Sequence, residues 1–203
     1  MRIVSGQELQ DWLAHGRVLE KDSRGPKVVL LQNRLILKIF HTRRHRWFAR
    51  INPPAKRFAQ NAGTLKSLDI SAPTIVETLW LDQNKGLSAC TYRPLLGTSL
   101  EALLRKNPAE IDPIIPALAA FILGLHRQGI YFRSLHLGNV LLLPEGGFGL
   151  IDFLDLVKKR GCLNSWEAKR NLNHLRSYLL RRKITDFPIE RLIESYSTAA
   201  RNL

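Results

Sequence analysis

The order of hydrophobic and polar positions predicts strands in the first half of the chain and helices in the second. Five strands are predicted where short apolar stretches alternate with turn residues, at residues 17–21, 27–31, 34–40, 74–81 and 86–91. A short amphipathic helix is predicted at residues 7–14. A longer helix is predicted after Pro53 and Pro54, where apolar side chains recur at helical spacing as far as Leu68.

The second half opens with a helix that must be buried. Residues 111–125 are nearly all apolar, so a helix formed from them has no polar face to turn toward water. Asp112 and Pro113 suit a first turn, but Pro116 indicates that the regular part starts later. The helix is expected to end near Gln128 and Gly129.

Two further helices are predicted toward the end of the chain. Asn164 and Glu167 have the spacing of a capping box, and the apolar residues of 189–196 recur at helical spacing. The predicted order of elements is typical of the α+β class, since strands, one helix and more strands are followed mostly by helices. A length of 203 residues suits one domain or two tightly joined lobes.

Cysteine usage and hydropathy narrow the class of protein. Cys90 and Cys162 form no C-x-x-C pair, and the six histidines form no zinc-binding pattern, so neither disulfides nor zinc are expected. The first residues are too polar for a signal peptide, and no run reaches the roughly 18 apolar residues of a membrane span. We expect a cytoplasmic protein, at most peripheral to the inner membrane.

A strong positive charge implies an anionic partner. The formal net charge is +14, and no acidic residue lies between Asp22 and Asp69. Charge alone does not name the ligand, and a solvated basic surface is an equally good explanation. Two stretches hold most of the basic residues, the first with Arg24, Lys27, Arg34, Lys38, Arg43, Arg44, Arg46, Arg50, Lys56, Arg57 and Lys66, the second with Lys158, Lys159, Arg160, Lys169, Arg170, Arg176, Arg181, Arg182 and Lys183.

The residues with the clearest chemical pattern follow the predicted buried helix. The segment FRSLHLGN at residues 132–139 is followed by a short apolar strand, a turn, a second apolar strand and then LIDF at residues 150–153. This arrangement resembles the catalytic and metal loops of protein kinases, where an aspartate and an asparagine precede a second aspartate. Ser134 stands in the position of the catalytic aspartate. Asn139 and Asp152, thirteen positions apart, keep the other two places.

A wider resemblance covers about residues 19–180. The sequence around Lys38, the turn at 97–100, residues 150–152 and the helix at 166–180 together resemble bacterial lipopolysaccharide core kinases of the Kdo/WaaP type and the related "toluene tolerance" proteins. The resemblance implies a two-lobed protein-kinase-like fold with a β-rich N-lobe carrying one helix (residues 1–91), a hinge (92–98) and a mostly helical C-lobe (99–203). It also implies use of ATP and Mg²⁺, with an inner-core sugar near the membrane as phosphate acceptor.

The resemblance assigns nucleotide-binding roles to five residues. Lys38 matches the strand lysine that reaches the nucleotide phosphates, and Tyr92 lies in the hinge that would contact adenine. Asn139 and Asp152 offer the hard oxygen ligands that Mg²⁺ prefers. The predicted helix after Pro54 has no acid to pair with Lys38, so Asn61 or Asp152 would have to hold the lysine.

Three departures put catalysis in question. Ser134 cannot accept a proton as a carboxylate does, the glycine-rich phosphate loop is missing, and the helix acid is missing. Losing a general base lowers a rate by about 10²–10⁴. His136 is either a replacement base or a loop histidine that packs against the strand pair, and Arg133 either binds phosphate or braces the loop.

Two alternatives to an active kinase follow from these departures. The first is a nucleotide-binding pseudokinase that regulates or scaffolds a partner. The second is a basic nucleic-acid-binding module, which is disfavoured because no aromatic stacking platform or recognition helix accompanies the charge. The pattern does not identify the acceptor or the oligomeric state.

Overall fold

The computed structural model describes residues 1–41 and 46–201, and the chain divides into two units. Unit 1 comprises Met1–Ser67 and Ala72–Leu95, and unit 2 comprises Leu68–Ser71 and Leu96–Leu203. The mixed helix and strand content is compatible with the predicted α+β class. The basic residues Arg43 and Arg44 lie outside the described residues.

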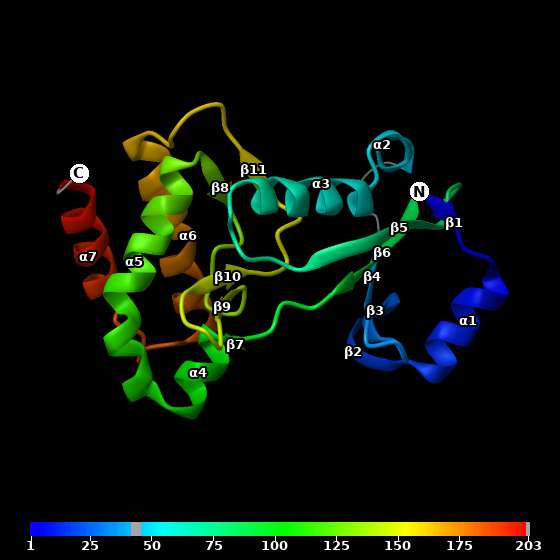
Figure 1. Cartoon of the computed structure of the whole chain (residues 1–203), viewed down its shortest axis with the longest axis horizontal. Coiled ribbons are helices and arrows are strands. Elements are labelled where there is room, and N and C mark those ends of the chain that lie inside the picture. The colour runs from blue at the N-terminus through cyan, green and yellow to red at the C-terminus, as the bar shows by residue number, and fades with distance from the viewer. Residues whose placement is uncertain (42–45, 202–203) are drawn as a thin grey trace. The chain divides into compact units, whose positions relative to one another are not determined.

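The five predicted strands of the first half form, together with a short strand at the N-terminus that was not predicted, one six-stranded sheet in unit 1 (Figure 1). β1 pairs with β5 in parallel, and the other neighbours are antiparallel. The order across the sheet is β1 (Arg2–Ile3), β5 (Thr74–Asp82), β6 (Leu87–Arg93), β4 (Ile36–Phe40), β3 (Gly25–Leu30) and β2 (Arg17–Asp22).

The sheet of unit 1 has two apolar faces. Successive side chains point to opposite sides of a strand, and β4 and β6 place apolar side chains on both sides. Leu37, Ile39 and Ala89 belong to a core cluster with side chains of α1 (Gly6–His15) packed against it. On the other face the Phe58 ring of α3 (Pro54–Ser67) lies 5.5 Å from the Phe40 ring, centroid to centroid. Lys38 alternates with Leu37 and Ile39 and therefore shares the α3 face.

Unit 2 is mostly helical, as predicted for the second half. The buried helix α5 contributes Ile115, Leu118 and Ile122 to the core and packs against α7. The helices are α4 (Leu100–Lys106), the 3₁₀ turn η1 (Pro108–Glu110), α5 (Ile111–Arg127), α6 (Ser165–Arg182) and α7 (Ile189–Arg201).

Two small sheets complete unit 2. The first has the order β10-β9-β7, and the second pairs β11 with β8 in antiparallel orientation. The strands are β7 (Thr98–Ser99), β8 (Ile130–Phe132), β9 (Val140–Leu142), β10 (Phe148–Leu150) and β11 (Leu156–Lys158). Gly129 precedes β8 with φ of 70°, and a Cβ at this position would lie 2.2 Å from the carbonyl oxygen of Gly161, so only glycine fits the entry to this sheet.

Three features of the structure differ from the sequence predictions or add to them. Among the described residues unit 1 carries the two predicted helices, α1 and α3, together with α2 (Arg46–Ile51), rather than the single helix that the resemblance implied. Leu68–Ser71 belongs to unit 2, since the Leu150 amide donates to the Ser71 carbonyl at 2.9 Å. The helix α5 starts at Ile111 despite Pro116, which is exposed and near the helix start, where water can reach the carbonyl that it leaves unbonded.

Within the described residues one segment, Pro108–Arg127, is long and apolar enough to cross a membrane by length and composition. The core helices of soluble proteins have the same properties. Helix α5, which makes up most of this segment, packs against α7 and buries Ile115 and Leu118 almost completely.

Candidate functional site

The loop after β8 is fixed to unit 2 by alternating buried side chains. Phe132, Leu135 and Leu137 are each no more than 1% exposed, so the polar residues between them are held near the surface. The Leu135 amide donates to the Phe132 carbonyl at 3.1 Å, and the Asn139 amide donates to the His136 carbonyl at 2.9 Å. These two turns give the loop a defined shape.

Asn139 connects this loop to the strand that precedes Asp152. Its side-chain Nδ2 donates to the Ser134 carbonyl at 3.1 Å, and its own carbonyl accepts from the Ile151 amide at 3.0 Å. Asp152 follows Ile151 directly. The antiparallel pairing of β9 with β10 therefore brings Asn139 and Asp152 to the same end of the hairpin, where Oδ1 is the acceptor atom of the Asn139 amide.

Asp152 has a backbone conformation that is uncommon for a residue with a side chain. Its φ is 51°, in the left-handed region, and its side chain is exposed between the buried residues Leu150 and Phe153. Such conformations carry a free-energy cost of about 1–3 kcal/mol and cluster at functional sites. The backbone conformation makes Asp152 a candidate functional residue.

Ser134 lies against a carboxylate that the sequence motif does not include. Its hydroxyl donates to Asp155 Oδ2 at 2.6 Å. The antiparallel register of β8 with β11 pairs Phe132 with Leu156, which brings the residues next to these two, Arg133 and Asp155, to the same end of the strand pair. Asp155 Oδ1 is buried and has no hydrogen-bond partner within the described part of the chain.

His136 packs against helix α6. Its ring stacks on Tyr178 of α6, with centroids 4.3 Å apart and an interplanar angle of 7°. Burial lowers the pKa of His136, although the carboxylates of Glu101, Asp152 and Asp155 act in the opposite direction. The imidazole is therefore neutral near pH 7 and is held as a packing element of the loop.

Glu101 anchors the Tyr178 ring on which His136 rests. The Tyr178 hydroxyl donates to Glu101 Oε2, and Arg105 and Arg182 each lie 3.2 Å from Glu101 Oε1. The Tyr178 hydrogen bond, followed by the arginine contacts, holds the pKa of Glu101 below its ordinary value. Burial and the bond to Glu101 raise the pKa of Tyr178 to about 12.

A buried chain of hydrogen bonds supports the start of the loop. Asn171 of α6 donates from Nδ2 to the Phe132 carbonyl at 2.6 Å, and its Oδ1 lies 3.1 Å from His126 Nε2. His126 Nδ1 lies 2.9 Å from the Tyr196 hydroxyl of α7. Because an amide oxygen only accepts, Nε2 carries the proton and Nδ1 accepts from Tyr196. Burial lowers the pKa of His126, which favours this neutral form.

The remaining predicted site residues lie in unit 1. Lys38 Nζ is 5.5 Å from the centroid of the Phe58 ring, and the Tyr92 ring is 6.1 Å from the same ring. Asn61 is half-buried, one turn beyond Phe58 on α3. Lys38 pairs across the sheet with Cys90, a thiol whose pKa burial raises to about 12. Lys38 and Tyr92 thus both lie near Phe58, and Asn61 follows Phe58 on the same helix.

Unit 2 brings together Ser134, Asn139 and Asp152, whereas Arg133 is exposed at the edge of the loop. The sequence motif missed Asp155, because its approach to Ser134 depends on the pairing of two three-residue strands, β8 and β11. Such short strands leave little periodicity to detect.

The donor set at the β9–β10 hairpin fits magnesium. Asn139 and Asp152 supply an amide oxygen and a carboxylate, the hard ligands that Mg²⁺ takes alongside substrate phosphates and water. No group of three or more His, Cys, Asp or Glu suited to a metal occurs in residues 1–41 and 46–201. A metal here would therefore depend on phosphate oxygens for much of its coordination.

Comparison of the chain with protein-family models and with curated proteins finds no match in either.

Proposed function

We propose that the chain is an ATP-dependent phosphotransferase with a protein-kinase-like fold, in which unit 1 corresponds to the small lobe and unit 2 to the large lobe. The observation that carries the proposal is the hydrogen bond from the Ile151 amide to the Asn139 carbonyl, which joins two oxygen ligands at one end of the β9–β10 hairpin. Ser134 is tied to the same group through the Asn139 side chain.

Each residue has a role in this proposal. Asn139 and Asp152 hold Mg²⁺, which, when bound, neutralises charge on the nucleotide phosphates. Lys38 contacts the phosphates, and Asn61 helps to orient the lysine. Tyr92, at the end of β6, contributes to adenine binding. The helix α3 contains no acidic residue, so the lysine is oriented without the usual helix carboxylate.

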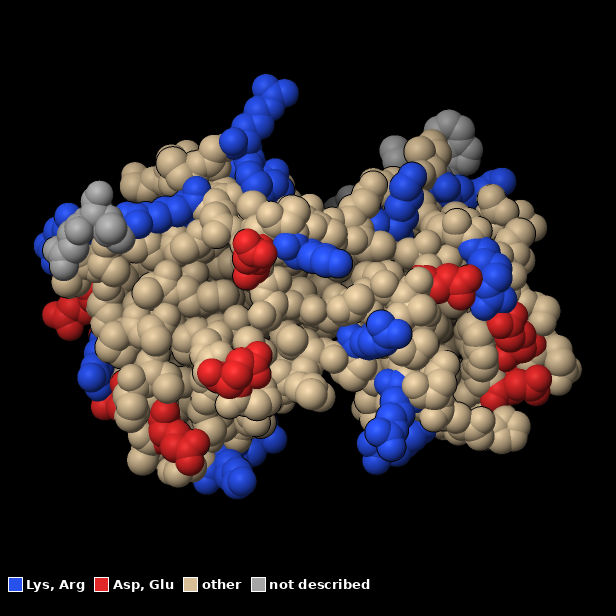
Figure 2. Space-filling view, viewed as in Figure 1, with Lys and Arg blue, Asp and Glu red and all other residues tan. Residues whose placement is uncertain are grey.

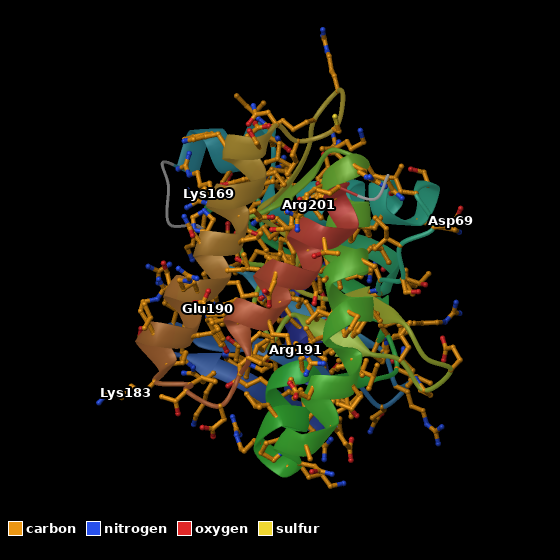
Figure 3. The ribbon with its side chains drawn as sticks, turned by 90° about the vertical axis from the view of Figure 1, so that its left-hand side faces the viewer. Asp69, Lys169, Lys183, Glu190, Arg191 and Arg201 are labelled. Atoms are coloured by element: carbon orange, nitrogen blue, oxygen red, sulfur yellow. The ribbon has the colours of Figure 1, made fainter. Side chains whose placement is uncertain are left out.

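The second basic stretch supports an anionic, amphiphilic acceptor such as an inner-core glycolipid. On α6 the exposed side chains combine cations with large apolar groups, since Trp166 is 64% and Leu180 is 74% exposed. Arg170 lies over the Trp166 ring at 5.1 Å from its centroid. Lys169 and Lys183 project outward at the two ends of the helix (Figure 3). Such a face suits anionic headgroups, which favours a cytoplasmic protein peripheral to the inner membrane.

Basic side chains are widely distributed beyond α6, and Figure 2 shows them over several parts of the visible surface. Several of those in unit 2 are already paired with acids, as Arg176 is with Glu190 at 2.6 Å and Lys159 is with Glu167 at 3.1 Å. The pairing reduces the charge available to a nucleic acid. The combination of cations with Trp166 and Leu180 is the observation that favours a lipid acceptor.

The proposal is tested by transfer of the γ-phosphate from Mg-ATP to an inner-core glycolipid and to water. Asp152→Asn should lower the transfer rate by about 10²–10³-fold, because it removes a negative ligand from the charged centre of the reaction. Glu145→Gln, an exposed change in the β9–β10 turn, is the matched control and should leave the rate unchanged.

The same assay separates the proposal from its rival. Binding of Mg-ATP without transfer to either acceptor would identify a pseudokinase, for which Ser134 in place of the catalytic aspartate is the supporting observation. Absence of both binding and transfer would reject nucleotide chemistry altogether.

A further inference from the structure

The contact between Ser134 and Asp155 is the most specific feature of unit 2 that the proposed function leaves unexplained. The Oγ–Oδ2 distance of 2.6 Å is that of a strong hydrogen bond from a hydroxyl to an ionised carboxylate. The second carboxylate oxygen, Oδ1, is buried and lacks a partner within the described residues. Buried polar atoms are nearly always satisfied, so an exception calls for an explanation.

The position of Asp155 is set by two backbone constraints. The pairing of Leu156 with Phe132 fixes where β11 begins relative to the loop, and the Leu156 amide donates to the Phe153 carbonyl at 3.2 Å. Phe153 is fully buried, which anchors the turn that contains Asp155. The carboxylate is thus held beside Ser134 by the fold and does not depend on a flexible side chain finding its partner.

We propose that Asp155 replaces the missing catalytic aspartate by acting through Ser134, an inference that depends on the phosphotransferase function proposed above. The Ser134 hydroxyl has one proton, which it donates to Asp155, and two lone pairs that remain to accept a hydrogen bond from the hydroxyl of the phosphate acceptor. Ser134 touches the substrate in this scheme, and Asp155 is a positioning residue that also takes up the released proton.

In the proposed step the γ-phosphoryl group passes to the acceptor, and the acceptor loses a proton that is relayed through Ser134 to Asp155. The acceptor oxygen forms a bond to the γ-phosphorus while the bond from that phosphorus to the β–γ bridging oxygen breaks, and ADP leaves with the electron pair. The proton of the acceptor passes to Ser134 Oγ as the Ser134 proton passes to Asp155 Oδ2. Asp155 ends protonated and Ser134 ends unchanged.

Two neighbouring groups are less well placed for the same task. The His136 ring is stacked on Tyr178 and its Nδ1 is buried without a hydrogen-bond partner among the described residues, so this nitrogen makes no hydrogen bond to the Ser134 hydroxyl. Arg133 is cationic and cannot accept a proton. Asp155 is the carboxylate that directly contacts the residue at the catalytic position.

The test measures Mg-ATP-dependent transfer to water and to an inner-core glycolipid by the full chain and its variants. Asp155→Asn keeps the size of the side chain and should lower kcat by about 10²–10⁴-fold, with the KM for ATP and the melting shift with Mg-ATP unchanged. Ser134→Ala should cause a similar loss, because it breaks the path between acceptor and carboxylate. Ser134→Thr keeps the hydroxyl and should keep most of the activity.

Combined variants separate the relay from a structural role. The double variant Ser134→Ala with Asp155→Asn should be no slower than either single variant, since both remove the same path. Ser134→Asp placed in the Asp155→Asn background should recover transfer. If the Ser134–Asp155 contact were purely structural, Ser134→Asp would not restore the transfer rate in this background. Glu145→Gln is the control for handling and folding.

Three results would overturn the inference. Unchanged transfer by Asp155→Asn would reject the relay while leaving the phosphotransferase function intact. A large increase in the transfer rate from Ser134→Asp alone would show that the natural chain has no working base. If the natural chain neither binds nor turns over Mg-ATP, the proposed function fails first and the relay fails with it. If Asp155→Asn does not fold, Ser134→Ala takes its place in the test, because it leaves the carboxylate in place. Loss of transfer in Ser134→Ala would then support the relay, and unchanged transfer would reject it.

Discussion

At the scale of single residues, His126 shows how a buried polar group can support a functional loop. It is 3% exposed and connects Tyr196 of α7 to Asn171 of α6, whose side chain holds the Phe132 carbonyl at the start of the loop. Protonation would add a second proton to the ring, at Nδ1 facing the Tyr196 oxygen, and would place a charge in the core of unit 2. The neutral form is therefore part of the fold.

This arrangement predicts a loss of stability on mild acidification. Burial lowers the pKa of His126 in the folded chain from its ordinary 6.5, so below that pH the unfolded chain binds a proton that the folded chain resists. Stability is present at neutral pH and is lost as the pH falls through the unfolded value toward the folded one. The pKa of His136 and that of His174 are also lowered, and both add to the effect.

Urea unfolding at pH 7.5 and pH 5.5 checks the prediction. The natural chain should be less stable at pH 5.5, and His126→Gln should lose about 1–3 kcal/mol at pH 7.5 with a smaller difference between the two pH values. The control is His15→Gln, at the exposed end of α1. An unchanged pH dependence in His126→Gln would contradict the assignment.

At the scale of elements, α6 supplies two side chains that contact the loop after β8. It supplies Asn171 and Tyr178, and its first turn is closed by a capping box in which Asn164 Oδ1 accepts from the Glu167 amide at 2.9 Å. The Glu167 side chain in turn accepts from the Asn164 amide at 3.3 Å. The helix is thus anchored at its start and directs its inner face toward the loop.

Removing the cap should weaken unit 2 by a measurable amount. Asn164→Ala should lower the free energy of unfolding by about 1 kcal/mol, because the Glu167 amide in the first turn loses the side-chain oxygen that it donates to. Asn173→Ala, at an exposed position inside the same helix, is the matched control and should be neutral or slightly stabilising, since alanine has the higher helix propensity. Equal destabilisation by the two variants would argue against the cap.

The same element shows what the sequence could predict. Asn164 and Glu167 are three residues apart and report a local hydrogen-bonding pattern, so the start of α6 was predictable and is confirmed. The hairpin that carries Asn139 and ends before Asp152 was predictable for a similar reason, because its strands are adjacent in sequence. The pairing of β8 with β11 joins residues separated by a longer stretch, and the position of Asp155 could not be predicted without it.

At the scale of the whole molecule, the residues proposed to bind nucleotide come from both units. Lys38 and Tyr92 lie near Phe58 in unit 1, with Asn61 on the helix that carries Phe58. Asn139 and Asp152 share one end of a hairpin in unit 2. Alternation along β4 determines the side of the sheet on which Lys38 lies, and the pairing of β9 with β10 determines the positions of Asn139 and Asp152. The central claim is that both groups bind the same class of ligand, Mg-ATP.

The measurement that tests this claim most directly is the melting temperature of the full chain with and without Mg-ATP. A ligand that binds the folded form at about 100 times its Kd adds about 2.7 kcal/mol, which for a chain of this size corresponds to a rise of about 5–10 °C. The rise should disappear in Lys38→Met and in Asp152→Asn, and persist in Glu145→Gln. No rise at millimolar Mg-ATP, or an equal rise in all four proteins, would contradict the account.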